Sequence, residues 1–269
     1  MPVLQFKDRK KNVGRMEICN QTETTADLNI FGDIVSDEWG KWSDEDTCPG
    51  DISEFLKNLD GAQEISLHIN SGGGSVFAGI AIYNMLRRSS AKITAYIDGI
   101  AASIASVIAC AGDRIIIPAN GTFMIHKPTN GYFLESLNAD QLRKDADTLD
   151  NCQKAILQTY MSKAKEGVTE DQINDLINAE TWMIGSEAAD YFDIEVEESV
   201  KAAACASEYY GRYKKTPEAL KTPKEPENGV DDIVDRVLKA LKDREDAAKE
   251  QEQENMKKEI LEDLDFYGV

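Results

Sequence analysis

The stretch HINSGGGSVFAG, residues 68–79, places three consecutive glycines between an apolar segment and a segment with helical spacing. Glycine has no Cβ, so the backbone N–H groups of such a loop can approach a bound group closely. The stretch therefore predicts a strand, a glycine loop that cradles a ligand or a reacting atom, and then a helix. A tight strand-to-helix turn that binds nothing is the alternative interpretation.

The same order of elements repeats along the chain beyond this loop. Strands are expected at residues 64–69, 92–97, 114–117 and 122–125, and helices at 76–88, 101–111, 138–165 and 170–177. Strands that alternate with helices through short connections are typical of right-handed crossovers and a mainly parallel sheet. The pattern predicts an α/β fold.

The region before the glycine loop is less regular. Two strands are expected at residues 15–20 and 26–30, and the second is expected to end in a turn at Gly32 and Asp33. A helix is expected at 51–59 with Asp51 as its N-cap, because a short acidic side chain accepts hydrogen bonds from the first N–H groups of a helix.

Changes in composition divide the chain into three parts. Residues 1–200 carry the α/β pattern and are expected to form one domain. Residues 201–229 include a stretch rich in proline and lysine, which is typical of a linker. Residues 230–269 are charged and helix-favouring with a thin apolar stripe, which predicts an acidic tail that is either helical or disordered.

Charge and cysteine content restrict the class of protein. The 269 residues carry a net charge of -19, which argues against nucleic acid and anionic membranes as partners. The longest apolar run, residues 100–111, is too short to span a bilayer. Five cysteines without a C-x-x-C pair, behind an amino terminus unlike a signal peptide, indicate a reducing, cytoplasmic environment.

The glycine loop does not match the common cofactor motifs. A phosphate-binding P-loop requires a lysine that this loop lacks, and Phe77 stands where a dinucleotide fingerprint requires its last glycine. Zinc is disfavoured because the chain has only two histidines and no C-x-x-C pair. We therefore expect neither a cofactor nor a metal.

A second candidate motif, GIAASIAS at residues 99–106, follows the strand expected at 92–97. Ser103 would lie in the first turn of a buried helix, where unpaired N–H groups and the helix dipole favour negative charge. Ser103 and Ser106 could equally be small residues that allow close helix packing. A nucleophilic serine needs a base, and His126 ends a strand at the same edge of the sheet, whereas His68 lies within a strand.

The three segments INSGGGSVFAG, GIAAS and MIHKP together resemble the conserved blocks of the ClpP family, the proteolytic subunit of the Clp protease. The resemblance covers residues 29–196 and is strongest to the ClpP-like proteases of phage head-gene clusters. It implies a serine endopeptidase in which Ser103 is the nucleophile and His126 the general base. The backbone N–H groups of Gly74 and Ile104 would form the oxyanion hole.

Two positions depart from the pattern of this family. Gly72 stands where the family usually has a proline, and Glu180 stands where it has its catalytic aspartate. A glutamate can orient the histidine of a hydrolase triad, although its extra methylene requires a shifted backbone. Asp175 and Asp171 are the reserve candidates for the acid.

The resemblance also implies an architecture and partners. It predicts repeated β–β–α units around a twisted, mainly parallel sheet, with a projecting handle helix at residues 138–165. It further implies a homo-oligomeric ring, protein and peptide substrates, and either an AAA+ unfoldase or phage capsid and scaffold proteins as partners. Any dependence on ATP would come from another protein, because the chain has no ATPase motif.

Two other functions remain open from the sequence. A crotonase-type enzyme uses the same oxyanion geometry on CoA thioesters and does not need the serine–histidine pair. A non-catalytic scaffold or adaptor would work through the acidic tail. Labelling of Ser103 by a serine-directed fluorophosphonate separates the protease from the adaptor.

Overall fold

The computed structural model describes residues 4–7, 13–16, 25–59, 62–131, 136–198 and 207–220. Contacts between residues divide the chain into two units, Met1–Thr222 and Pro223–Val269. Every described element belongs to the first unit. The acidic tail expected at 230–269 lies outside the described residues.

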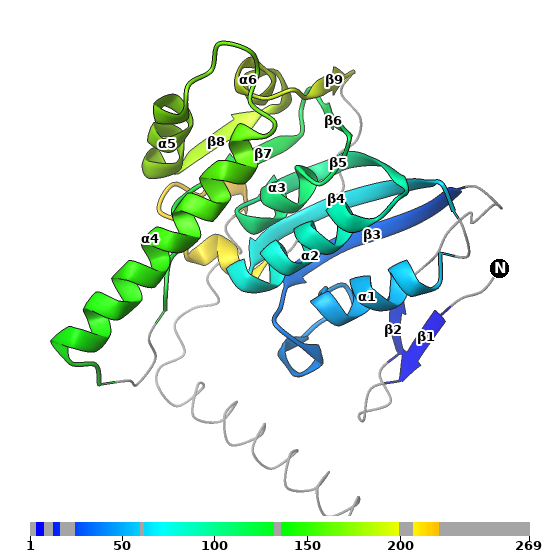
Figure 1. Ribbon diagram of the computed structural model, residues 1–269, viewed down its shortest axis with the longest axis horizontal. Coiled ribbons are helices and arrows are strands. Elements are labelled where there is room, and N and C mark those ends of the chain that lie inside the picture. Colours follow the sequence, from blue (N-terminus) through cyan, green and yellow to red (C-terminus); the bar gives the residue numbers. More distant parts are fainter. Residues whose placement is uncertain are drawn as a thin grey trace, which may run out of the picture. The chain divides into compact units, whose positions relative to one another are not determined.

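A seven-stranded sheet forms the centre of this unit (Figure 1). Its strands are β3 (Thr25–Ile34), β4 (Glu64–Gly74), β5 (Lys92–Ala102), β6 (Arg114–Pro118), β7 (Thr122–Ile125), β8 (Thr181–Ile184) and β9 (Glu195–Glu197). The main order is β3-β4-β5-β6-β9, and β7 pairs with both β5 and β8. Among the described strands of this sheet, only the β7–β8 pair is antiparallel, which agrees with the mainly parallel α/β sheet expected from the sequence.

Strand β5 is shared by two neighbours on the same edge. Its first part pairs with β6 through Thr94, Ala95 and Tyr96, and its last part pairs with β7 through Ile100, Ala101 and Ala102. The sheet therefore forks at β5. One branch continues to β6 and β9, and the other continues to β7 and β8.

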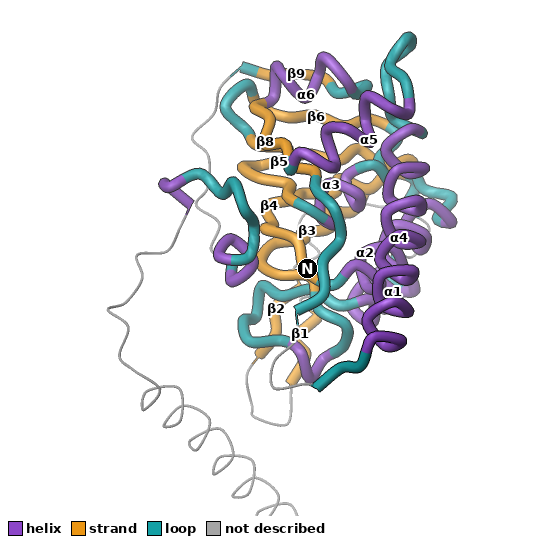
Figure 2. Tube along the Cα trace, turned by 90° about the vertical axis from the view of Figure 1, so that its left-hand side faces the viewer, coloured by secondary structure: helices purple, strands orange, loops and turns teal. Residues whose placement is uncertain are grey.

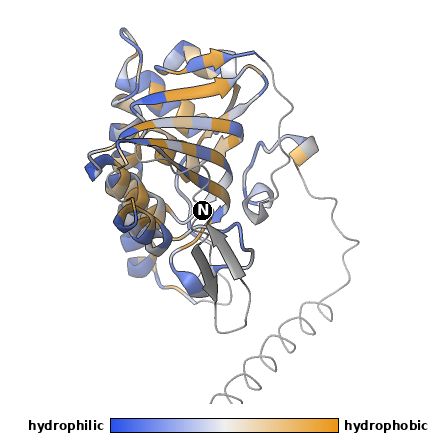
Figure 3. Cartoon of the chain, turned by 90° about the vertical axis from the view of Figure 1, so that its right-hand side faces the viewer, coloured by the Kyte–Doolittle hydropathy of each residue, from blue (hydrophilic) through white to orange (hydrophobic). Residues whose placement is uncertain are grey.

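Helices α1 (Pro49–Lys57), α2 (Val76–Arg88), α3 (Ile104–Ala109) and α4 (Ala139–Met161) lie on one side of the strands (Figure 2). Helices α5 (Glu170–Ala179) and α6 (Gly185–Tyr191) flank the β7–β8 branch. One large apolar cluster fills the space between the sheet and these helices. Hydrophobic residues accordingly concentrate on the strands and on the inner faces of the helices (Figure 3). A separate hairpin, β1 (Leu4–Lys7) with β2 (Val13–Met16), precedes the sheet.

The turn expected at Gly32 and Asp33 is not formed. Strand β3 continues to Ile34 with alternating burial, and its register against β4 shifts between Phe31 and Asp33. Gly32 has a φ of +75°, and a Cβ there would lie 2.8 Å from the carbonyl carbon of Glu45. The glycine therefore marks a β-bulge within a strand rather than its end.

Helix α1 also begins earlier than the sequence suggested. Its N-cap is Cys48, and Pro49 occupies the first turn, where the missing N–H costs nothing. Asp51 lies three residues after the cap, and its carboxylate accepts a hydrogen bond from the Cys48 N–H at 2.7 Å. Asp51 thus serves the helix start as the distal member of a capping box and not as the N-cap.

The long helix α4 has two dissimilar halves. Asn138 caps its start, and its buried residues, Cys152, Ile156, Leu157 and Tyr160, all fall in the second half. The first half projects from the sheet, as expected for the handle helix (Figure 1). Among the described helices, none combines the length and apolarity that crossing a bilayer requires.

Candidate active site

The glycine loop is the end of strand β4 and not a free-standing turn. Gly73 and Gly74 have φ values of +101° and +148°, which residues with a Cβ rarely adopt. A Cβ on Gly74 would lie 2.1 Å from the Ile34 carbonyl oxygen, and one on Gly73 would lie 2.7 Å from the Ala102 carbonyl oxygen. These glycines therefore allow the ends of β3, β4 and β5 to converge.

Ser103 connects β5 to α3 in an unusual backbone conformation. Its φ of 55° and ψ of -125° lie outside the regions that residues with a Cβ prefer, at a cost of about 1–3 kcal/mol. Its N–H donates to the Met124 carbonyl at 2.9 Å. The sharp strand-to-helix turn presents the side chain at the carboxyl edge of the sheet, a geometry similar to the nucleophile elbow of α/β-hydrolases.

The buried side chain of Ser106 supports this turn. Its Oγ lies 2.6 Å from the Ser103 carbonyl, 3.0 Å from the Met124 carbonyl and 2.7 Å from the Tyr160 hydroxyl. Burial raises the pKa of Tyr160, so its hydroxyl stays protonated. The sequence placed Ser106 in a packing role only, because Tyr160 comes from the distant helix α4.

His126 follows β7 and reaches the nucleophile candidate. Because Ala102 of β5 is in register with Met124 of β7, the residues after these strands emerge side by side. Ser103 Oγ lies 2.7 Å from His126 Nε2. Burial lowers the pKa of His126 to about 4, although the charge of Glu180 acts in the opposite direction. The imidazole is therefore neutral at pH 7, and its Nε2 can accept the proton of the serine hydroxyl.

Glu180 lies directly across the strand pair from His126. Ile125 pairs with Thr181 in the antiparallel β7–β8 ladder, so continuing this register places His126, the residue after Ile125, opposite Glu180, the residue before Thr181. Glu180 ends α5 with a positive φ of 51° and is only 8% exposed. Among the described residues, however, its carboxylate accepts hydrogen bonds from the backbone N–H groups of Lys214 and Lys215, and it forms no hydrogen bond with His126.

The reserve acids lie elsewhere. Asp171 and Asp175 are exposed residues of α5, on the face opposite Ile173 and Ile177, which pack into the core. Neither forms a hydrogen bond with His126 among the described residues. The structure therefore brings Ser103, His126 and Glu180 to one edge of the sheet and leaves the two aspartates outside it.

His68 belongs to a different cluster. Its Nδ1 lies 3.0 Å from a carboxylate oxygen of Asp98, and its ring stacks on Tyr96 with centroids 5.0 Å apart. The bond to Asp98 raises the pKa of His68 against the effect of burial. The other histidine of the chain thus has a local partner within the sheet and does not contact Ser103.

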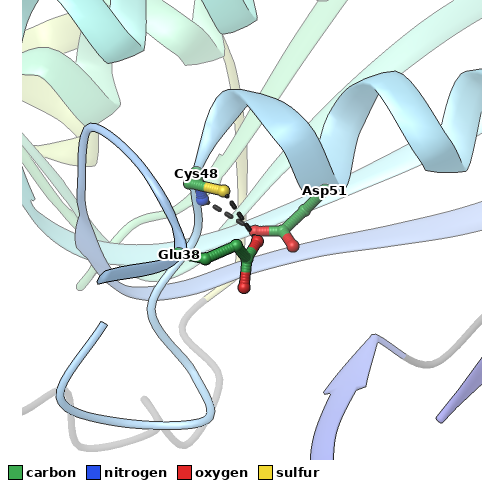
Figure 4. A group of neighbouring side chains, drawn as sticks. All are labelled: Glu38, Cys48 and Asp51. Carbon is green, nitrogen blue, oxygen red and sulfur yellow. Dashed lines mark hydrogen bonds between the residues drawn. The ribbon is translucent and has the colours of Figure 1, made fainter. Parts of the chain in front are cut away.

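Glu38, Cys48 and Asp51 form a compact group near the start of α1 (Figure 4). Lys41 already supplies the positive charge of this group, with its Nζ 3.1 Å from Glu38 and 2.7 Å from Asp51. Burial raises the pKa of the Cys48 thiol to about 12, and the thiol donates to Glu38 at 3.0 Å. Internal bonds account for the cluster, which stabilises the beginning of the helix.

A segment that the sequence assigned to the linker packs on this site. We call residues 207–220 the covering segment; it contains the short 3-10 helices η2 (Glu208–Gly211) and η3 (Glu218–Leu220), drawn in yellow in Figure 1. The Tyr213 ring lies 4.8 Å from the His126 ring, edge to face, and its hydroxyl donates to the Gly72 carbonyl. The tyrosines of this segment, unlike its lysines and prolines, are the signal in the sequence that it would pack.

The fold and site define an α/β protein with a serine–histidine pair at the carboxyl ends of parallel strands. The Clp protease family profile matches residues 52–193. The ATP-dependent Clp protease proteolytic subunit of Ligilactobacillus salivarius is 33% identical over 140 residues, which span 51% of this chain and 68% of that protein. The corresponding subunit of Bacteroides fragilis is 30% identical over 140 residues and is matched over 65% of its length.

A solved structure agrees with this assignment at the level of fold. An asparagine-to-aspartate mutant of ClpP1 from Listeria monocytogenes matches with a TM-score of 0.50 and 22% identity, covering 64% of this chain and 91% of that one. The chain belongs to the Clp protease family. Membership of this family indicates a peptidase, and the fold is the ClpP/crotonase-like fold expected from the motifs.

Proposed function

We propose that the protein is a serine endopeptidase that uses Ser103 as nucleophile and His126 as general base. The observation that carries the proposal is the 2.7 Å contact between Ser103 Oγ and the Nε2 of a neutral His126. Such a pair generates a nucleophile at neutral pH, because the histidine takes the hydroxyl proton as the oxygen attacks.

The proposed reaction has two steps, acylation of the serine and hydrolysis of the acyl-enzyme. Ser103 Oγ bonds to the substrate carbonyl carbon, and the developing oxyanion is held by the N–H groups of Gly74 and Ile104. Ile104 is the first residue of α3, so its N–H has no acceptor within the helix. His126 returns the proton to the leaving amine, and water, activated by the same histidine, releases the acyl group. Glu180 is the acid that steadies the imidazolium when its carboxylate faces His126.

The partners are those of a ClpP-like peptidase. Substrates are peptides and proteins, and the working form is a homo-oligomeric ring in the cytoplasm. The relatives' names describe ATP-dependent proteases, which supports an AAA+ unfoldase as partner. Phage capsid and scaffold proteins remain the alternative partners, and the acidic tail is suited to recognising them.

The test is removal of the nucleophile. Ser103→Ala should abolish cleavage of a fluorogenic peptide and of casein, and should abolish labelling by a fluorophosphonate at that position. The matched control is Ser90→Ala, which alters an exposed serine outside the site and should change neither readout. Substantial peptide cleavage by Ser103→Ala would refute the assignment, and a wild-type chain that is never labelled would favour the adaptor.

A further inference from the structure

The covering segment contacts three different parts of the proposed active site. At the glycine loop, the Tyr213 hydroxyl donates to the Gly72 carbonyl. At the base, the Tyr213 ring packs against His126. At the acid, the N–H groups of Lys214 and Lys215 bind the Glu180 carboxylate, the first at 2.8 Å. These contacts place the segment beside the serine–histidine pair, whose two residues are half-buried, and engage the acid that the base would use.

The segment fills an apolar site of its own. Tyr210 and Tyr213 are only 2% and 8% exposed, and they pack in a cluster separate from the main core. The wall of this cluster consists of Ile100, Ala102 and Met124, with Trp182 and Leu220 packed against it. Ala102 directly precedes Ser103, and Met124 lies two residues before His126. The two tyrosines therefore pack beside the proposed catalytic pair.

Gly72 fits this arrangement in a way that a proline would not. A Cβ at this position would lie 2.3 Å from Ser207 Oγ and 2.4 Å from Ser207 Cβ. The backbone of Gly72 does not have a positive φ, so the close approach of Ser207 is what requires a glycine here. The Ser207 hydroxyl in turn donates to the Asp33 carboxylate. The departure from the usual proline at position 72 thus provides the space in which the segment lies.

We propose that this face is a binding site for a tyrosine-bearing peptide and that its resident ligand is the chain's own covering segment, which must leave before a substrate enters. The proposal rests on the proposed function, since the same face would hold the substrate. A substrate carbonyl bound to Ser103 would occupy the space beside His126 that the Tyr213 ring fills, so the two cannot be present together. Departure of the segment also releases Glu180 to face His126.

The test forces the segment off without altering it. In the full chain, Gly72→Ala should increase deuterium uptake by residues 207–220 and should raise the rate of fluorophosphonate labelling at Ser103 roughly tenfold, because several buried contacts are lost. The matched control is Gly211→Ala, within the segment, where a Cβ meets nothing within 4 Å, and it should behave as wild type. Adding Ser207→Gly to Gly72→Ala should return both readouts toward wild type.

A second variant covers the case in which Gly72→Ala also loosens the sheet. Tyr213→Ala introduces no new atoms, and a fluorescein-labelled peptide of residues 207–220 should bind this variant saturably but should not bind wild type, whose site is filled. Absence of peptide binding to the folded variant, or unchanged exchange and labelling in Gly72→Ala, would overturn the proposal. If exchange and peptide binding behave as expected but Ser103 is never labelled, the protease assignment fails and the docking site stands.

Discussion

Replacing Ser106 with alanine tests what holds Ser103 in its strained conformation. The Ser106 hydroxyl lies within 3.0 Å of the Ser103 and Met124 carbonyls and of the Tyr160 hydroxyl. Its loss leaves the buried Tyr160 hydroxyl with only a 3.5 Å contact to the Ser103 carbonyl. An orphaned buried polar group costs about 1–3 kcal/mol, so Ser106→Ala should lower the free energy of unfolding by about 2 kcal/mol.

The matched control is Tyr160→Phe, which removes the other end of the same bond. Ser106 then keeps its two carbonyl acceptors, so the free energy of unfolding should fall by less than about 1 kcal/mol. In the double variant neither hydroxyl remains without a partner. Its loss of unfolding free energy should therefore be smaller than the sum of the losses of the two single variants. Urea unfolding of the four proteins measures this double-mutant cycle.

Catalysis should respond in the same order. Because Ser106 fixes the carbonyl of the strained residue, Ser106→Ala should reduce kcat for a peptide about tenfold with little change in KM, and Tyr160→Phe should reduce it less. The reasoning would be refuted if Tyr160→Phe were as destabilising as Ser106→Ala. It would also be refuted if Ser106→Ala left both unfolding and turnover unchanged.

Three further outcomes are expected. Burial lowers the pKa of His126 to about 4, below its unfolded value of about 6.5, so the protein should lose stability as the pH falls from 6.5 toward 4. Between pH 7 and pH 5, His126→Asn should lose about 2 kcal/mol less free energy of unfolding than wild type does, measured by urea unfolding. Glu180→Gln should lower kcat less than Ser103→Ala does. If Asp175→Asn lowered kcat and Glu180→Gln did not, Asp175 would be the acid instead. A chain ending at Thr222 should keep peptide turnover and lose recognition of its large protein partner; loss of the oligomer instead would place the tail in the fold.

Much of the fold was predictable because its signals are local. The alternation of apolar strands and amphipathic helices depends on neighbouring residues, and the order of elements from β4 to α5 follows the sequence prediction. The ends of strands were less predictable. Gly32 suggested a turn and Gly73 a loop after the strand, yet each lies within a strand and permits a close approach by another segment. That approach cannot be read from the sequence, because it depends on which segment lies beside the strand.

The site shows the same division. Ser103 and His126 could be expected to meet, because both follow strands whose carboxyl ends share an edge. The supporting contact of Ser106 with Tyr160 could not be predicted, because it joins α3 to the helix α4, which lies outside the sequence motifs. The packing of Tyr213 on His126 was also missed, because lysine and proline dominate the composition around it and indicate a linker.

The fork of the sheet at β5 has a mechanical consequence. Ser103 continues from β5 itself, whereas His126 and Glu180 belong to the β7–β8 branch, which is held to β5 by three pairs of residues. A tilt of that branch that moved His126 by only about 1 Å would take the 2.7 Å contact beyond hydrogen-bonding distance. The distance between Ser103 and His126 therefore depends on how the β7–β8 branch is seated on β5. The helix α4 contacts this branch through Tyr160 and Phe123, so a displacement of α4 relative to β5 would change that distance.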